Sequence, residues 1–261
     1  MPADPRLLTA SFRAQKLLET YGITGPTEIV LEDIAWALGI EIVTAALAGA
    51  EAHLVRVGNT GTITLSDAIT EIGRRRFAIA HELGHWELHK DISQSFFCSE
   101  ADMRQYQQSG PEIEANTFAS ELLLPKTMIN PGILKAEPDL EIIREWSQTF
   151  NVSFTSAAVR YAGITRQPVM VVFSDGNQVR WWRRNEDRMA GFWFESEQRL
   201  GSCSIAADLN KNPRQAGVMR PVDWSAWFPH LEDKGEELFE CAVQLHPYQT
   251  TLSLLWLPSR Y

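Results

Sequence analysis

The chain has 261 residues, of which 44% are hydrophobic and 22% charged, and its formal net charge is −9. This composition is that of a globular protein with one large domain or two ordinary ones. Three cysteines, no apolar run of membrane-spanning length and no secretory signal argue against a disulfide framework, a membrane protein and a secreted one, so we expect a cytoplasmic protein. Most of the negative charge lies in residues 1–165, which makes that part a poor nonspecific binder of nucleic acid.

The first part of the chain alternates between helical and strand patterns. Two helices and three strands are predicted, over 5–21, 27–38, 40–43, 53–57 and 62–65. Residues 58–61 separate the last two strands and predict a hairpin. An edge strand of this sheet, beside the helix that follows, is a place where an extended peptide could add by main-chain pairing.

The most informative pattern is His81-Glu82-Leu83-Gly84-His85, whose flanks favour a helix over about 73–89. Two histidines four residues apart lie on one face of a helix, so both imidazoles can bind one Zn²⁺. Glu82 lies beside them, where it can accept a proton from a water on the metal. His89 follows one turn later, and we expect it to support the site or the fold rather than to bind the metal.

A third zinc ligand is predicted on the helix that begins at Pro111 and ends before Pro125. Glu112 and Asn116 are four residues apart and share a face of this helix. We therefore predict Glu112 as the ligand, with Glu114 as the alternative, and Asn116 as a side chain that orients a zinc-bound histidine or the carboxylate. Acidic residues are also common at helix starts for electrostatic reasons alone.

Two histidines and one glutamate form the three-ligand set of a catalytic zinc site, with one Zn²⁺ per chain and a fourth position for water. Zinc lowers the pKa of that water, and Glu82 would accept its proton and later deliver it to the leaving amine of a cleaved peptide. The residue that stabilises the oxyanion is not identified by the sequence.

Cys98 lies on a segment, 91–109, that we expect to be irregular and that joins the two predicted ligand-bearing helices. A thiolate is a strong zinc ligand, so Cys98 is a candidate inhibitory ligand that would displace the water in the resting enzyme. The alternative is a cysteine that packs like any small apolar residue.

The stretches FAIAHELGH (77–85) and ANTFASELLLP (115–125), together with Glu112, resemble the ImmA/IrrE metallopeptidases. The resemblance is specific over about residues 70–125. It implies a gluzincin-like peptidase that cuts a helix-turn-helix transcriptional repressor and so releases genes for phage transfer, DNA-damage response or antiviral defence. The alternative is a ligand-sensing regulatory protein that contains zinc and does not cut.

The expected fold class is α+β, with a zincin-like peptidase domain over 1–135 and a helix-turn-helix-like segment over 136–165. The segment contains two predicted helices, 139–149 and 154–162, and the second carries one base, Arg160, so packing is preferred over DNA reading. Strand patterns follow at 169–173, 179–183 and 251–256. The family resemblance implies that 166–261 is a smaller α/β, GAF-like sensor domain.

A basic and aromatic cluster in this last part consists of Arg180, Trp181, Trp182, Arg183 and Arg184. Arginines near aromatic rings suit single-stranded DNA, whose bases stack and whose phosphates pair with cations. We therefore consider single-stranded DNA as an activator of the peptidase. The ordinary alternative is a half-buried strand whose tryptophans face the core.

Overall fold

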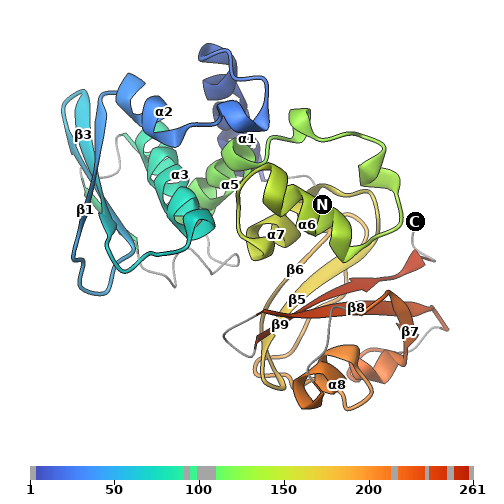
Figure 1. Cartoon of the computed structure of the whole chain (residues 1–261). Coiled ribbons are helices and arrows are strands. Elements are labelled where there is room, and N and C mark those ends of the chain that lie inside the picture. The colour runs from blue at the N-terminus through green and yellow to red at the C-terminus, as the bar shows by residue number, and fades with distance from the viewer. Residues whose placement is uncertain are drawn as a thin grey trace. The chain divides into compact units, whose positions relative to one another are not determined.

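The computed structural model describes residues 4–90, 95–98, 110–212, 217–232, 235–245 and 250–258, and for 95–98 only the backbone. The chain divides into two compact units, Met1–Ile129 with Trp146–Ser156, and Asn130–Glu145 with Ala157–Tyr261. Both units mix helices and strands, which confirms the α+β class (Figure 1). Within the described ranges, no helix has both the length and the apolar character that a bilayer crossing requires.

The first unit contains a four-stranded sheet in the order β1-β3-β2-β4. Its elements, without the parts of α6 and α7 described below, are α1 (Pro5–Thr20), η1 (Pro26–Glu28), α2 (Leu31–Ala37), β1 (Ile40–Ala45), β2 (Ala52–Val57), β3 (Thr60–Ser66), α3 (Ile72–Leu88), β4 (Ser95–Cys98), α5 (Pro111–Leu123) and η2 (Lys126–Met128). The predicted hairpin is present, since β2 and β3 pair antiparallel around Gly58, whose φ is +61°. Buried Leu54 lies opposite buried Ile63, and α3 contacts both strands.

Two expectations for this unit were wrong. The helix predicted over 27–38 is a 3₁₀ turn followed by the shorter α2, because Ile29 and Val30 adopt extended or intermediate backbone angles that interrupt a helix. Within the segment expected to be irregular, β4 pairs antiparallel with β2, with Cys98 opposite Ala52. A four-residue strand has too short a pattern to be recognised, and its partner is distant in sequence.

The helices α3 and α5 lie side by side (Figure 1). Gly84 allows this close packing. A Cβ placed on Gly84 would lie 3.0 Å from the Cα of Ala115 and 3.1 Å from its carbonyl oxygen. Two small residues therefore face each other where the helices approach. This approach brings the histidines of one helix next to the glutamates of the other.

The second unit contains a five-stranded antiparallel sheet in the order β6-β5-β9-β8-β7. Its elements are η3 (Ile133–Lys135), parts of α6 (Leu140–Thr149) and α7 (Phe154–Ile164), β5 (Val169–Asp175), β6 (Gln178–Arg184), α8 (Ile205–Lys211), β7 (Arg220–Val222), η4 (Trp224–Ala226), β8 (Leu238–Leu245) and β9 (Thr250–Trp256). The sheet packs against α8 (Figure 1). The core of this unit is rich in aromatic side chains and includes Phe194, Trp227 and Phe228.

The helical segment expected as a separate part, 136–165, is shared between the two units. Its middle, 146–156, belongs to the first unit, where Ser153 lies against Gly73 of α3. The flanking parts belong to the second unit, where the carbonyl of Leu134 accepts hydrogen bonds from the backbone N–H of Arg166 (2.8 Å) and the hydroxyl of Thr165 (3.2 Å). Each of the two helices therefore contributes residues to both units.

A buried carboxylate, Glu240 of β8, forms hydrogen bonds with several parts of the second unit. It accepts hydrogen bonds from the backbone N–H groups of Ile205 (2.8 Å) and Ala206 (2.9 Å) at the start of α8. The indole N–H of Trp227 (2.9 Å) and the hydroxyl of Ser253 (3.3 Å) also donate to it. Burial raises the pKa of Glu240, and these hydrogen bonds oppose the shift.

Candidate metal centre

The helix α3 supplies His81, Glu82 and His85 from its most buried stretch, 77–86. All three side chains are fully buried, which is unusual for groups that can carry charge. The Nε2 atoms of His81 and His85 face each other at 3.0 Å. Two imidazoles whose ring nitrogens face the same point can bind one metal ion between them.

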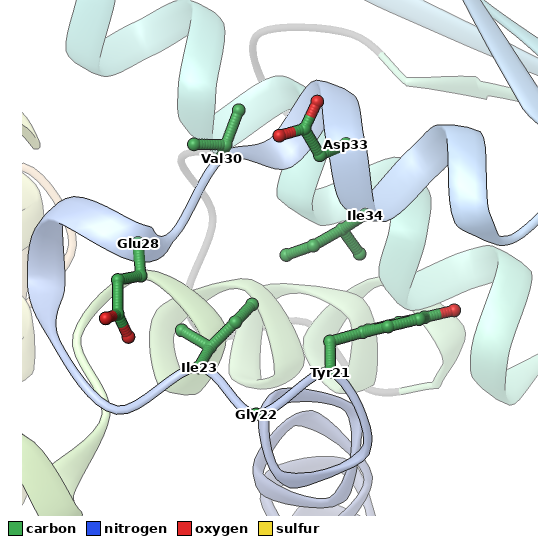
Figure 2. Close-up of a pocket in the computed structure, with 7 residues that line it drawn as sticks. All are labelled: Tyr21, Gly22, Ile23, Glu28, Val30, Asp33 and Ile34. Atoms are coloured by element: carbon green, nitrogen blue, oxygen red, sulfur yellow. The ribbon is translucent and has the colours of Figure 1, made fainter.

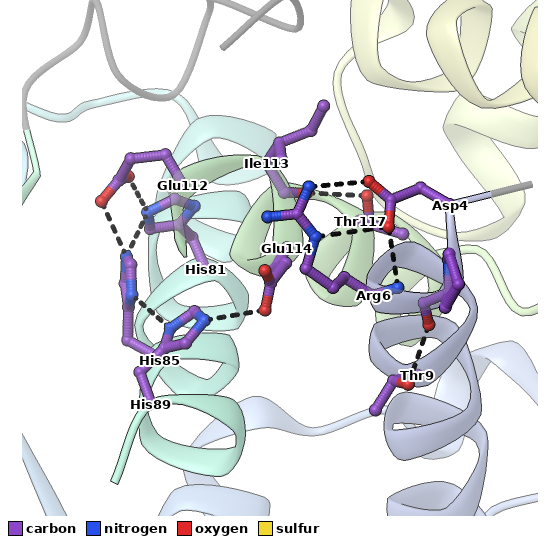
Figure 3. A network of polar contacts seen from close by, with 11 residues as sticks. Asp4, Arg6, Thr9, His81, His85, His89, Glu112, Ile113, Glu114 and Thr117 are labelled. Carbon is purple, nitrogen blue, oxygen red and sulfur yellow. Dashed lines mark hydrogen bonds and ion pairs between the residues drawn. The ribbon is translucent and has the colours of Figure 1, made fainter. Parts of the chain in front are cut away.

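Glu112 approaches the two histidines from the first turn of α5 (Figure 3). Its carboxylate oxygens lie 3.1 Å from Nε2 of His81 and 3.4 Å from Nε2 of His85. The closest candidate ligand atoms are thus 3.0 to 3.4 Å apart, near the edge of about 3.3 Å of a tetrahedron with zinc-to-nitrogen bonds of about 2.0 Å. Both the spacing and the donor set fit zinc.

Asn116 fixes the orientation of His81. Its Oδ1 lies 3.0 Å from Nδ1 of His81, and the amide is buried. An amide oxygen only accepts, so Nδ1 of His81 carries the proton and donates it. The lone pair of the ring is therefore on Nε2, the atom that faces Glu112 and His85.

The three groups have shifted pKa values. Burial would lower the pKa of His81, but its hydrogen bond to Glu112 and the charges of Glu82 and Glu112 outweigh burial and raise it. At His85 burial dominates and lowers the pKa to about 4. Burial would raise the pKa of Glu112, yet its hydrogen bonds with the two histidines hold it below the usual range. The carboxylate is thus present in the ionised form that binds a metal.

Glu114, the alternative ligand, lies elsewhere. Its Oε2 is 3.2 Å from Nε2 of His89, and Nδ1 of His89 is 2.9 Å from Nδ1 of His85 (Figure 3). The sequence indicated that His89 has a supporting role but gave no sign of its contact with Glu114. Cys98 is placed by its backbone in β4, and its side chain lies outside the described residues, so its role as an inhibitory ligand stays a prediction.

The basic and aromatic cluster is divided between the two faces of the sheet. Trp181 stacks on Phe173 with ring centroids 5.1 Å apart, whereas the neighbouring Trp182 packs on the opposite face against Phe194. Two of the arginines have acidic partners: Arg180 pairs with Asp175 (3.2 Å), and Arg184 pairs with Glu186 (2.9 Å). The two tryptophans therefore do not form one stacking platform.

A pocket of about 280 Å³ lies elsewhere in the first unit, where α1 ends and α2 begins (Figure 2). It is lined by Tyr21, Gly22, Ile23, Glu28, Val30, Asp33 and Ile34. The carboxylate of Glu28 accepts hydrogen bonds from the backbone N–H groups of Thr24 (2.7 Å) and Gly25 (3.0 Å). No residue of the histidine site lines it, so the pocket adds no group to that chemistry.

A comparison with known protein families matches the part of the chain that contains the histidine site. Residues 35–161 match the family model described as the IrrE N-terminal-like domain, Peptidase_M78. A search of curated proteins found no match. The fold is similar to that of a Mycobacterium tuberculosis transcriptional regulator, with a TM-score of 0.62 and 15% sequence identity over 95% of this chain and 76% of that chain. At this identity the likeness concerns the fold.

Proposed function

Because residues 35–161 match the model of the IrrE N-terminal-like peptidase domain, we propose that the chain is a zinc-dependent endopeptidase with a regulatory role. The observation that carries the proposal is the convergence of His81, His85 and Glu112 from two helices, with Glu82 buried beside them. Members of this family depend on zinc. The donor atoms are spaced for that ion and drawn from residue types that it prefers.

In this proposal His81, His85 and Glu112 hold the ion, which when bound acts as a Lewis acid and lowers the pKa of water. Glu82 accepts the proton of the attacking water and passes it to the nitrogen of the leaving amine. Asn116 keeps His81 in the tautomer whose Nε2 is free to bind. Because Glu82 is fully buried, its proton transfers take place away from bulk solvent.

For the substrate we propose a helix-turn-helix transcriptional repressor, cut once in a linker or an accessible helix. The family resemblance supports this substrate, and the fold-level likeness to a transcriptional regulator is consistent with it. Cleavage would release stress, DNA-damage or phage-defence genes. The second unit, a five-stranded sheet with α8 packed against it, would be a GAF-like sensor that controls the peptidase, with single-stranded DNA as a candidate signal.

The test compares Glu82→Gln with the wild-type chain. This change keeps the three proposed ligands and removes the base, so zinc content should stay near one per chain while repressor cleavage falls by several orders of magnitude. Glu41→Gln, at an exposed position of β1, is the control for loss of a carboxylate and should cut normally. Zinc is measured by metal analysis, and cleavage by electrophoresis of a candidate helix-turn-helix repressor, with casein as the generic substrate.

Undiminished cutting by Glu82→Gln would refute the assignment of the base. Broad digestion of casein would refute the restricted substrate class. A wild-type chain that binds zinc and cuts neither protein would favour the second interpretation, a zinc-containing regulator that senses a ligand and does not cleave.

A further inference from the structure

The two proposed histidine ligands are supported in different ways. His81 donates to a neutral amide, Asn116, at 3.0 Å. His85 instead contacts the imidazole of His89 at 2.9 Å, and His89 contacts the carboxylate of Glu114 at 3.2 Å (Figure 3). The side chain of His89 is 1% exposed and that of Glu114 19%, so the contacts run from a buried ligand towards the surface.

The proton positions along this chain of contacts follow from one condition. If Nε2 of His85 binds a metal, its proton must be on Nδ1, and Nδ1 then donates to Nδ1 of His89. A nitrogen that accepts carries no proton, so His89 has its proton on Nε2. That N–H points to Glu114, whose carboxylate is an acceptor without donors. The tautomer of His85 is thus fixed by His89, and the tautomer of His89 is fixed by the negatively charged carboxylate of Glu114.

We propose that His89 and Glu114 are positioning residues for His85, which they hold in the orientation and tautomer required for binding zinc. This inference rests on the proposed function, because it assigns a task to residues around that same site. A carboxylate behind an imidazole also makes the ligand nitrogen a stronger electron donor. His85 is therefore oriented, through His89, by the charged carboxylate of Glu114, whereas His81 is oriented by the neutral amide of Asn116.

Glu114, at the far end of this series of contacts, also interacts electrostatically with a cation. Arg6, at the start of α1, forms a 2.9 Å ion pair with Asp4, and the charge of Glu114 contributes to raising the pKa of Arg6. Figure 3 shows Arg6 on the side of Glu114 away from the histidines. Glu114 thus lies between a histidine that donates to it and a cation that attracts it.

The experiment measures the zinc dissociation constant by chelator competition, and the visible absorption spectrum of the Co²⁺ form, for variants of both residues. His89→Leu removes the acceptor and should weaken zinc about 10- to 100-fold. His89→Asn restores an acceptor like the one that His81 has, and should recover most of that loss. Glu114→Leu should fall between the two. The Co²⁺ spectrum of His89→Leu should change, because the His85 ring is no longer held.

Thr117→Val is the matched control, since it removes a 2.7 Å hydrogen bond to Ile113 within α5 and leaves the ligands untouched. Its zinc affinity should equal that of the wild type. A folded His89→Leu with affinity within twofold of the wild type and an unchanged Co²⁺ spectrum would overturn the inference. If His89→Leu does not fold, equal affinities of Glu114→Leu and the wild type overturn it instead. Absence of zinc binding by the wild type would be a failure of the proposed function.

Discussion

His81 and His85 lie one helical turn apart, yet their pKa values are shifted in opposite directions. In the metal-free chain a proton on either ring competes with zinc. His81 has a pKa raised above 6.5, so when the pH is lowered zinc affinity should begin to fall before pH 6.5 is reached, and below the pKa of His81 it should drop about tenfold per pH unit. His85, with a pKa of about 4, should add a second proton only near pH 4.

This pH dependence is measured as the zinc dissociation constant between pH 5 and pH 8, together with proton release in calorimetry. About one proton should be released per zinc bound near pH 6. Release of two protons at that pH would show that both histidines are protonated in the free chain and would contradict the shift at His85.

The sequence was most informative about the relative positions of residues on the same helix. The spacing of His81 and His85 defines a shared face, and the step from Glu112 to Asn116 favoured Glu112 over Glu114 as the ligand. The structure places Glu112 beside the histidines and Asn116 against His81. The contact of His89 with Glu114 could not be predicted, because it depends on how far apart two helices lie.

Among the helices and strands, the close approach of α3 to α5 is what brings the residues of the candidate site together. Gly84→Ala inserts a methyl group about 3 Å from the backbone of Ala115, so the helices must separate by a few tenths of an ångström. We expect a loss of about 1–3 kcal/mol in the free energy of unfolding, together with weaker zinc binding. Chemical denaturation and chelator competition measure the two effects.

The control for this prediction is Gly163→Ala in α7, where a new Cβ meets no atom within 4 Å. Alanine there should leave zinc affinity unchanged and stabilise the chain slightly, because alanine favours a helix. If Gly84→Ala matched that control in both measurements, the close approach would have no energetic importance.

In the second unit, the packing of α8 on the sheet depends on Glu240. In Glu240→Gln an amide NH₂ replaces one oxygen and faces the N–H donors of Ile205, Ala206 or Trp227. The expected cost is about 3 kcal/mol in the free energy of unfolding at neutral pH, measured by urea denaturation with tryptophan fluorescence. Glu237→Gln, exposed beside β8, should have no effect, and equal stability of the two variants would count against this role.

Elements were predictable where a repeating pattern extended over several residues. The helix of the histidines and the strands β5, β6 and β9 have such patterns, and the structure contains them close to the expected bounds. The strand β4 and the break between η1 and α2 have none. Their conformation comes from pairing with β2 and from the backbone at Ile29 and Val30, which single-sequence patterns do not contain.

At the scale of the whole molecule, the division of the chain was the least predictable property. The sequence placed boundaries near 135 and 166, the second where the pattern changes to strands. The structure instead assigns 130–145 to the second unit. Leu140 of this segment donates a backbone hydrogen bond to Cys241 of β8, which ties the segment to the second sheet. Such a connection depends on tertiary contacts rather than on local composition.

The proposed control by single-stranded DNA concerns the whole chain and can be tested on it. An oligonucleotide should bind through the exposed side of β6 with an affinity that falls steeply with salt. Replacing Arg180 and Arg183 by glutamine should remove most of that binding, whereas Arg144→Gln, on α6, should not. Fluorescence titration at low salt is the measurement. No binding by the wild type under those conditions would rule out this signal.

The close pairing of α3 and α5 has a consequence beyond chemistry. Their proposed zinc ligands lie on two separate helices, so a bound ion would act as a removable cross-link that closes the loop between them. Such a cross-link stabilises the folded chain by about 4 kcal/mol when the free metal exceeds its dissociation constant a thousandfold. Metal supply would then determine how long the protein survives proteolysis, and starvation for zinc would remove the protein itself as well as its proposed activity.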